Sequence, residues 1–404
     1  MGGRLSGRNM WAAIGIQSAK GTAGRVGEFF EINDVGGCLE EYSTIESNRR
    51  INNRFKGSGY LGSKSVPWSL TLEANTKNIG YLLYAALGSE TGTELSTPTR
   101  YQHSFTDTDE LPYVTIVVYT AGVADDSGTD KFHVIQDAKI GEFGISGGTD
   151  DVTLVSLSGV GMSRSAVATT LAGSVGGVGN DEVTVASTAG LIKGMAVVTD
   201  TGVTTTISSI TDGTDFVLAD AAVGATGFTF SPTFQTGKPL FFNSDEGTGI
   251  LKIGASLGAA AQFDESTHFE LNWNNGLSAD HRIHGSSTAF GMEEGDSVME
   301  GSATVIFNAD SFAEIDAYQA GTDRALWAVW TSKNLISGST YESLDIKITK
   351  SRYTGTPPSW DPDVITAELH LHAVRTGCQV FNIPVRVPRL CLRIIAEQMQ
   401  NILV

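Results

Sequence analysis

The chain has 404 residues and a formal net charge of −18 at pH 7, and only 18% of its residues are charged. This length allows two or three domains, and the 47 glycines favour a turn-rich, β-rich architecture. The surplus of acidic groups argues against a protein that holds DNA by its phosphates, because that mode needs clustered Lys and Arg. Three widely spaced cysteines favour a reducing compartment over a disulfide framework, and neither a membrane span nor a secretory signal is expected.

Residues 15–22 read GIQSAKGT and contain the glycines, lysine and threonine of a phosphate-binding loop. A Walker loop needs G-x-x-x-x-G-K-[ST], whereas here the order of Lys20 and Gly21 is reversed. We expect neither a buried strand before this segment nor a helix after it. We therefore interpret it as a lead-in to the first strand, which packs on its own or a neighbouring subunit, and predict no nucleotide cofactor.

Alternating apolar and polar residues predict antiparallel strands that each have one buried face. The clearest is HFELNW, where Phe269, Leu271 and Trp273 share one face. Further strands are predicted at 113–120, 151–160, 302–309, 344–350 and 365–374. Helical spacing predicts two helices, one that ends at Gly88 and one that ends at Gly321, with Ser311 and Glu314 in the relation of a capping box.

The order strand, long loop, strand, helix, strand, strand occurs twice, which indicates an internal duplication. Between the copies lies a Gly/Thr/Ser/Val-rich segment with five predicted short strands. We expect a first unit at 1–163, an inserted small all-β domain of Ig-like type at 164–235, and a second unit with a C-terminal extension at 236–404. The last residues are basic and apolar, and the sequence leaves open whether they dock on a neighbour or extend freely.

Candidate chemistry is sparse. Glu368, His370 and His372 share one face of a predicted strand, which is a known arrangement for a first pair of zinc ligands. The polar face of an ordinary antiparallel sheet explains the same pattern without a metal. No nucleophile motif or catalytic triad can be recognised. The sequence therefore predicts no enzyme, no metal and no cofactor.

Two long loops of opposite charge precede the predicted helices. The first contains Arg49, Arg50, Arg54 and Lys56. The second contains Glu293, Glu294 and Asp296. One interpretation is a pair of solvated loops. The other is that the basic and acidic loops meet between stacked subunits, where opposite charges orient the contact.

Four stretches together resemble the tail tube proteins of long-tailed bacteriophages in their two-domain form. They are AAIGIQSAKGTAG near the N-terminus, the strand–loop–strand unit at 271–308, the helix at 311–327, and the closing hairpin at 342–374. The resemblance implies a mainly β fold, with two fused gpV-like β-sandwich units, each flanked by a helix.

The resemblance also implies a structural virion protein that assembles in the host cytoplasm into stacked rings and forms the tail tube. The implied ring has three chains with pseudo-sixfold symmetry, with a ring of six chains as the alternative. Its implied partners are the tape-measure, tail-tip and tail-terminator proteins, and double-stranded DNA that passes through the lumen without specific binding. The inserted domain would lie on the tube exterior, and no membrane is involved. The rival interpretation is a secreted or surface carbohydrate-binding β protein, such as an adhesin.

Overall fold

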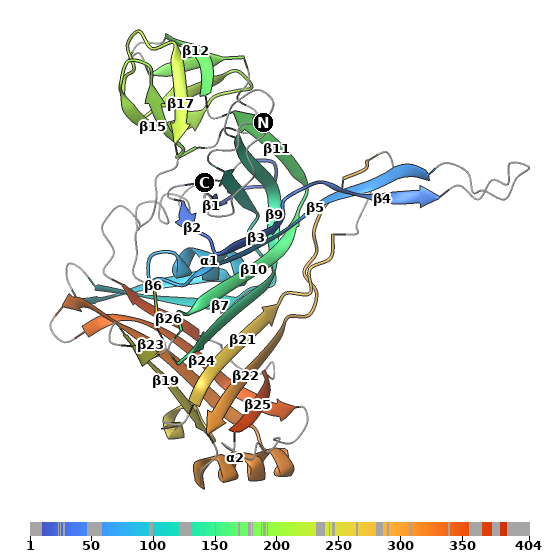
Figure 1. The fold of residues 1–404 in the computed structure, drawn as a ribbon, viewed down its shortest axis with the longest axis vertical. Helices are drawn as coiled ribbons and strands as arrows, with labels where there is room; N and C mark the ends of the chain where they lie inside the picture. The colour runs from blue at the N-terminus through green and yellow to red at the C-terminus, as the bar shows by residue number, and fades with distance from the viewer. Residues whose placement is uncertain are drawn as a thin grey trace, which may run out of the picture.

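The computed structural model describes most of the chain. The described residues are 10–22, 24, 26, 29–46, 59–96, 100–120, 131–149, 151–168, 170–176, 179, 181–186, 188, 191, 193–231, 239–241, 243–244, 247–263, 266–279, 286–288, 291–306, 309–337, 340–354, 366–373 and 380–385. They form a mainly β fold, in which a 20-stranded sheet system is accompanied by a small separate barrel (Figure 1). The expected fold class is confirmed.

The described residues before the barrel form eleven strands and one helix. The strands are β1 (Met10–Ile16), β2 (Phe30–Glu31), β3 (Asp34–Gly37), β4 (Glu41–Glu46), β5 (Gly59–Glu73), β6 (Gly88–Ser96), β7 (Arg100–Asp107), β8 (Val114–Thr120), β9 (Lys131–Gly148), β10 (Leu154–Gly161) and β11 (Ser163–Ala168).

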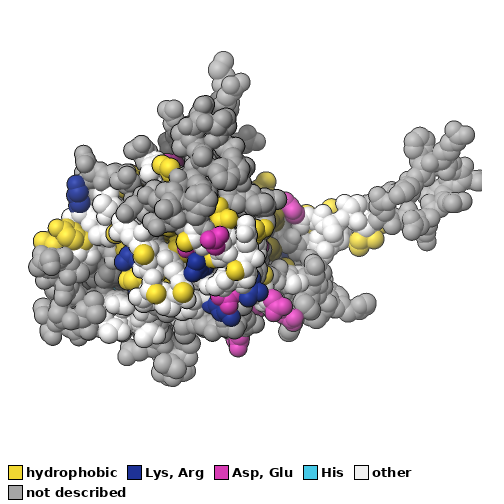
Figure 2. Space-filling model, turned by 90° about the horizontal axis from the view of Figure 1, so that it is seen from below, with side chains coloured by type: hydrophobic (Ala, Val, Ile, Leu, Met, Phe, Trp, Pro, Cys, Tyr) yellow, Lys and Arg dark blue, Asp and Glu magenta, His cyan; other side chains and the backbone are white. Residues whose placement is uncertain are grey.

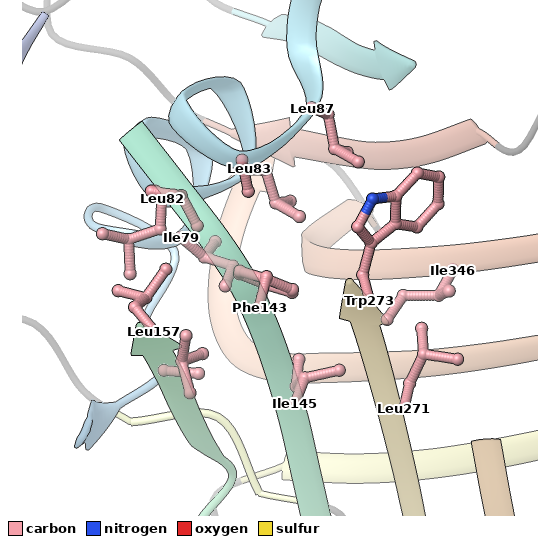
Figure 3. Close-up of a cluster of buried hydrophobic side chains, with 14 of the residues drawn as sticks. Ile79, Leu82, Leu83, Leu87, Phe143, Ile145, Leu157, Leu271, Trp273 and Ile346 are labelled. Atoms are coloured by element: carbon pink, nitrogen blue, oxygen red, sulfur yellow. The ribbon is translucent and has the colours of Figure 1, made fainter. Parts of the chain in front are cut away.

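Helix α1 (Ile79–Leu87) lies where helical spacing predicts it and ends at Gly88. Gly88 has a φ of 88°, a left-handed conformation that glycine adopts without steric cost. The helix buries its leucines against the sheet, where Leu83 and Leu87 point toward the side chains of Phe143 and Trp273 (Figure 3). Tight packing between one helix and two strands thus forms the centre of the main hydrophobic core.

The described residues after the barrel form nine strands, a short 3-10 turn and a second helix. They are β18 (Asn243–Ser244), β19 (Gly247–Gly254), η2 (Leu257–Ala259), β20 (Ala261–Gln262), β21 (Ser266–Asn274), β22 (Val298–Ile306), α2 (Ala309–Ala320), β23 (Arg324–Ser337), β24 (Thr340–Thr354), β25 (Thr366–Ala373) and β26 (Val380–Val385).

Helix α2 ends before Gly321, as expected, but its predicted capping box is wrong. Ser311 lies inside the helix, which already begins at Ala309, so it does not precede the first turn. Glu314 accepts hydrogen bonds from the side chains of Tyr353 and Arg324. Its carboxylate therefore joins the helix to β23 and β24.

The strand pairing of the first part recurs in the second. In the first part β1 pairs with β8, β8 with β9, β9 with β10, and β10 with β5. In the second part β19 pairs with β23, β23 with β24, β24 with β25, and β25 with β22. In each part the last strand of this series has one further partner: β5 pairs with β3, and β22 pairs with β21. We call residues 10–168 the first repeat and residues 239–385 the second repeat.

The six strands between the repeats form a closed barrel in the order β12-β13-β16-β15-β14-β17. They are β12 (Thr170–Gly176), β13 (Glu182–Val185), β14 (Ala196–Thr199), β15 (Thr204–Ile210), β16 (Asp215–Leu218) and β17 (Gly227–Ser231). The segment is all-β as expected, but the closed barrel differs from an Ig-like sandwich. The reason is that β12 and β15 each pair with one neighbour along their first half and with another along their second half.

The second repeat also contacts the first through its last described strand. β26 pairs with β24 on one side and with β7 of the first repeat on the other. The expected C-terminal extension beyond residue 385 lies outside the described residues. Among the helices that are described, none has the length and apolar character needed to cross a membrane.

Candidate assembly surfaces

One face of the main sheet is polar and hollowed. It contains a hollow of about 740 Å³, lined by residues from β5, β9, β10, β21 and β22. Its charged lining residues are Glu142, Asp296 and Glu300, and no Lys or Arg is among them. The alternation of side chains along a strand explains why this face is polar. Phe143, which follows Glu142, points to the opposite, buried side of the sheet. The lining of the hollow therefore combines negative charge with uncharged polar residues and apolar ones.

Hydrogen bonds order the side chains of this polar face. Glu142 accepts hydrogen bonds from Ser158 Oγ and from Asn274 Nδ2, at 3.1 and 3.2 Å. Gly144, two residues further along β9, lies between Ser156 and Asn272. It leaves room for their side chains, because a Cβ at this position would lie 2.4 Å from Ser156 Oγ and 2.6 Å from Asn272 Oδ1. These contacts hold the Glu142 carboxylate within the polar surface of the sheet.

The two repeats are joined by direct strand pairing. β21 of the second repeat pairs antiparallel with β9 of the first, from His268 opposite Gly148 to Asn274 opposite Glu142. The pairing gives a continuous run of strands in the order β3, β5, β10, β9, β21, β22, β25, β24. One end of this run is β3 of the first repeat, and the other is the C-terminal end of β24, from Arg352 to Thr354, because the preceding part of β24 also pairs with β23 and β26.

Asn275, just after β21, anchors this joint. Its side-chain amide donates to the carbonyl oxygens of Ala86 and Ile140, at 3.0 and 2.9 Å, and its Oδ1 accepts from Trp273 Nε1 at 2.7 Å. All of these groups are buried, so each bond satisfies a polar atom that water cannot reach. This role could not be predicted from the sequence, because an Asn in a long polar loop is usually solvated.

A second contact across the joint involves Glu294, one of the acidic loop residues selected from the sequence. Its carboxylate forms an ion pair with Lys139 of β9 and accepts a hydrogen bond from the backbone N–H of Leu111. Lys139 is almost fully buried, with a side chain that is 3% exposed, and its ammonium lies 4.5 Å from the centre of the Tyr113 ring. Glu294 is thus engaged within its own chain and neutralises a buried cation.

The other candidate loop residues have different surroundings. Glu293 and Asp296 are exposed, and the backbone of Glu293 pairs with that of Ser278. Arg49, Arg50, Arg54 and Lys56 lie outside the described residues. The contact between a basic and an acidic loop of stacked subunits therefore stays a prediction.

The strands that flank the basic loop are described and form a projecting arm. β4 and the first half of β5 pair as a hairpin that stands out from the body (Figure 1, Figure 2). The arm carries exposed hydrophobic side chains, namely Tyr42, Ile45, Tyr60 and Leu61. Near its base the backbone N–H of Lys64 in β5 donates to the backbone carbonyl of Ser287, so the arm touches the second long loop within one chain. Projecting apolar surface of this kind is typical of a contact with another molecule.

The interpretation of the GIQSAKGT segment as a lead-in ahead of the first strand was wrong. Its first two residues, Gly15 and Ile16, are the buried end of β1, which pairs with β8 along its whole length, whereas Ser18 to Thr22 form an exposed turn. The backbone N–H of Gly21, which a phosphate would need, donates instead to the carboxylate of Asp137. Among the described residues between Thr22 and β2 there is no helix. This geometry suits a turn packed on β9 and does not suit a nucleotide.

The strand predicted around Glu368, His370 and His372 is β25, which pairs with β22 and β24. The register places His372 opposite Glu300 and His370 opposite Ser302. The side chains of β25 lie outside the described part of the structure. The described side chains contain no cluster of three or more potential metal ligands.

Comparison with known proteins gives one family. The family model described as "Phage tail tube protein" matches residues 39–373. Among solved structures, a chain of an extracellular contractile injection system, the PVC sheath-tube complex in its extended state, is 15% identical. That alignment covers 41% of this chain and 92% of the other, with a TM-score of 0.24, a value too low to support an argument about fold. No curated protein sequence has a significant match.

Proposed function

The chain belongs to the phage tail tube protein family, and we propose that it polymerises as stacked rings into a hollow tube through which DNA enters the host. Its role is structural, as a component of the virion tail. The observation that carries the proposal is the pairing of β21 with β9, which joins two similar units edge to edge within one chain. A second chain can add to the sheet in the same way.

Head-to-tail addition needs two complementary edges, and the run of paired strands has them. Its first edge is β3, which pairs only with β5 among the described strands. Its last edge is the C-terminal end of β24, from Arg352 to Thr354, which pairs with β25 on one side. Because the two edges differ, the contact is heterologous and closes into a ring when the rotation per chain divides a full turn. We favour three chains per ring, so that six repeats surround the axis, with six chains as the alternative.

The polar face of the sheet is the proposed lumen surface. Its Glu142, Glu270 and Glu300 would repel the phosphates of double-stranded DNA, which favours sliding over binding. A closed ring of strands also removes the open edges of β3 and β24, which would otherwise pair without control. The barrel of β12 to β17 then lies on the tube exterior, and the tape-measure, tail-tip and tail-terminator proteins are the expected partners.

The basic loop is the proposed contact between rings, because the described strands that precede and follow it in the chain, β4 and β5, form the projecting arm. Replacing Arg49, Arg50 and Arg54 together by Glu should shorten tubes without unfolding the protein. Tube length is measured by negative-stain electron microscopy and folding by circular dichroism. Tubes of normal length and yield would show that these arginines do not hold rings together.

Negative-stain microscopy of the purified protein tests the function itself. Tubes or rings with an open channel are the expected result. A stable monomer that binds glycans would favour the alternative of a carbohydrate-binding β protein, which the family match makes the weaker of the two.

A further inference from the structure

The two repeats share an irregularity in their strand pairing that matches them residue by residue. Beside Ala138, the pairing of β8 with β9 skips one residue of β8 and two residues of β9. Beside Ser351, the pairing of β23 with β24 skips one residue of β23 and two residues of β24. Because the two bulges have the same form, Ser351 is the counterpart of Ala138. The residue after each is a cation, so Arg352 is the counterpart of Lys139.

The match extends to the next strands of the sheet. Across β10, Lys139 is aligned with Pro67 of β5. Across β25, Arg352 is aligned with Glu300 of β22. The sequences that follow agree with this alignment, since WSLTL after Pro67 and GSATV after Glu300 have Ser and Thr at the same positions. The strands β5 and β22 are therefore counterparts in register.

The hairpins that leave these two strands are counterparts as well. The residue two positions before Pro67 pairs with Glu41, which begins the projecting arm. The residue two positions before Glu300 pairs with Asn274, which leads into the loop 275–297. The arm of the first repeat and this loop of the second repeat are thus the same element, and only the loop packs back on the sheet.

In the first repeat, the loop 275–297 covers the end of α1 and the nearby cation. Asn275 donates to the carbonyl oxygen of Ala86, and the last three residues of α1 are buried. Glu294 pairs with Lys139, whose side chain is 3% exposed. The loop therefore completes the joint between the repeats.

In the second repeat, the corresponding surface is open. The helix α2 takes the place of α1, because it follows the counterpart strand and also ends at a left-handed glycine. It lies at the end of the molecule farthest from the barrel (Figure 1), and its last residues, Gln319 and Ala320, are exposed. Beside it, Lys350 and Arg352 are 39% and 54% exposed and share one carboxylate, that of Asp323.

We propose that the base of the arm of one chain, with Leu39 and Tyr42, docks on the end of α2 and on Arg352 of a second copy of the same chain. Leu39 is 60% exposed and lies in the stretch between β3 and β4 that corresponds to Trp273. The side chain of Trp273 packs beside Leu87 at the end of α1 (Figure 3). Tyr42, which is 43% exposed, follows Glu41 as Asn275 follows Asn274.

A second copy is the occupant because the proposed ring places β3 of one chain beside the end of β24 of the next, as β21 lies beside β9. The arm, which continues from β3, then passes Arg352 as the loop 275–297 passes Lys139. Charge complementarity supports the contact, because Glu40 and Glu41 lie at the base of the arm and the opposing surface has two cations for one carboxylate. The inference rests on the proposed ring assembly and adds the residues of the contact.

Photo-crosslinking tests the contact directly. A benzoylphenylalanine is placed at position 39 in a mixture of unlabelled and ¹⁵N-labelled chains, and assembled material is irradiated and digested with trypsin. We expect the peptide 26–49 of one chain to be linked to the peptide 283–324 of another, which contains the end of α2, so that mixed-isotope products appear. The same crosslinker at Val223, a 68% exposed residue of the barrel, is the matched control and should give no such link.

Substitutions give a second readout that does not depend on the crosslinker. Leu39→Asp should raise the lowest protein concentration that forms rings by about tenfold or more, while Val223→Asp should not. On the opposing surface, Ala320→Arg should have the same effect, whereas Ala313→Arg, at an exposed position in the first half of the same helix, should not. All four positions are exposed, so the melting temperatures of the variants should stay close to that of the wild type.

The outcomes separate this contact from the proposed function. Links within one chain, links to another surface, or normal assembly of Leu39→Asp and Ala320→Arg would overturn the contact even if tubes form. Failure of the wild-type protein to form any ring would instead refute the proposed function.

Discussion

The two repeats share one order of strand pairing but differ in the surroundings of a lysine in their corresponding strands, β9 and β24. In the first repeat, the lysine of β9 is covered, paired with Glu294 and nearly inaccessible. In the second, Lys347 of the corresponding strand β24 is partly exposed beside Asp345. The chain therefore has one joint that is complete within it, where β21 pairs with β9. In the proposed ring, the same kind of strand pairing would join the free edges of neighbouring chains.

The largest expected effect comes from breaking the completed joint. Glu294→Gln keeps an acceptor for the Leu111 N–H but leaves Lys139 as a buried, uncompensated cation. We expect a loss of about 3 kcal/mol in the free energy of unfolding, measured by urea denaturation. Lys139→Met in the same chain should recover most of it. An equally large effect of Lys347→Met alone would contradict the distinction between the repeats.

Asn275→Ala tests the hydrogen-bonded anchor of the same joint. The variant leaves the carbonyl groups of Ala86 and Ile140 and the indole N–H of Trp273 without their partner, so we expect a loss of about 2–3 kcal/mol. The neighbouring Asn274→Ala is the matched control, because the side-chain bonds of Asn274 are exposed. It should cost less than about 1 kcal/mol. Equal losses for the two variants would show that burial at the joint is unimportant.

A pH series sharpens the comparison in the second repeat. Burial raises the pKa of Asp345 above its usual value, and nearby Lys347 only partly opposes this. The folded state therefore binds this proton more tightly than the unfolded state, so the contribution of Asp345 to stability falls as pH rises through its folded pKa. Asp345→Asn should gain in melting temperature relative to the wild type between pH 4 and pH 7.

Asp323→Asn is the control with the opposite sign. Hydrogen bonds from Lys350 and Arg352 lower the pKa of Asp323, so its contribution is present near neutral pH and lost as pH falls. This variant should be less stable than the wild type at pH 7 and should approach it at low pH. The same pH trend for both variants would contradict the assigned causes.

The smallest effect concerns the left-handed residue after each hairpin strand. Gly276→Ala places a Cβ 2.9 Å from the Asp296 carbonyl oxygen at a φ of 58° and should cost about 1–2 kcal/mol. Cys38 adopts a φ of 62° without being glycine, so Cys38→Gly relieves strain but removes a half-buried thiol. Its net effect on the melting temperature should be close to zero. A large loss on Cys38→Gly would show that the thiol packing dominates.

Local patterns predicted part of this fold. The strand around Phe269, Leu271 and Trp273 and the helix that ends at Gly88 are where alternation and helical spacing place them. No alternating pattern predicted β9, the strand that joins the repeats, because its apolar residues are interrupted by Gly141, Gly144, Gly147 and Gly148. β12 was missed in the barrel for the same reason, since its sequence TLAGSVG lacks bulky β-formers.

The functional surfaces were harder to predict than the strands. Glu294 was selected because of its charge, but its partner Lys139 lies 155 positions away in the chain, and no local pattern connects them. Asn275 likewise binds backbone carbonyls of residues far apart in sequence. Long-range contacts of this kind follow from the sheet order, which depends on how the repeats pair.

The most direct test of the account is an electron cryomicroscopy map of the assembled tube in which strands can be traced. The account predicts that β3 of one chain lies beside the C-terminal end of β24 of its neighbour, with Glu142 and Glu300 facing the channel. A map in which β3 borders solvent, or in which the polar face points away from the channel, would contradict it.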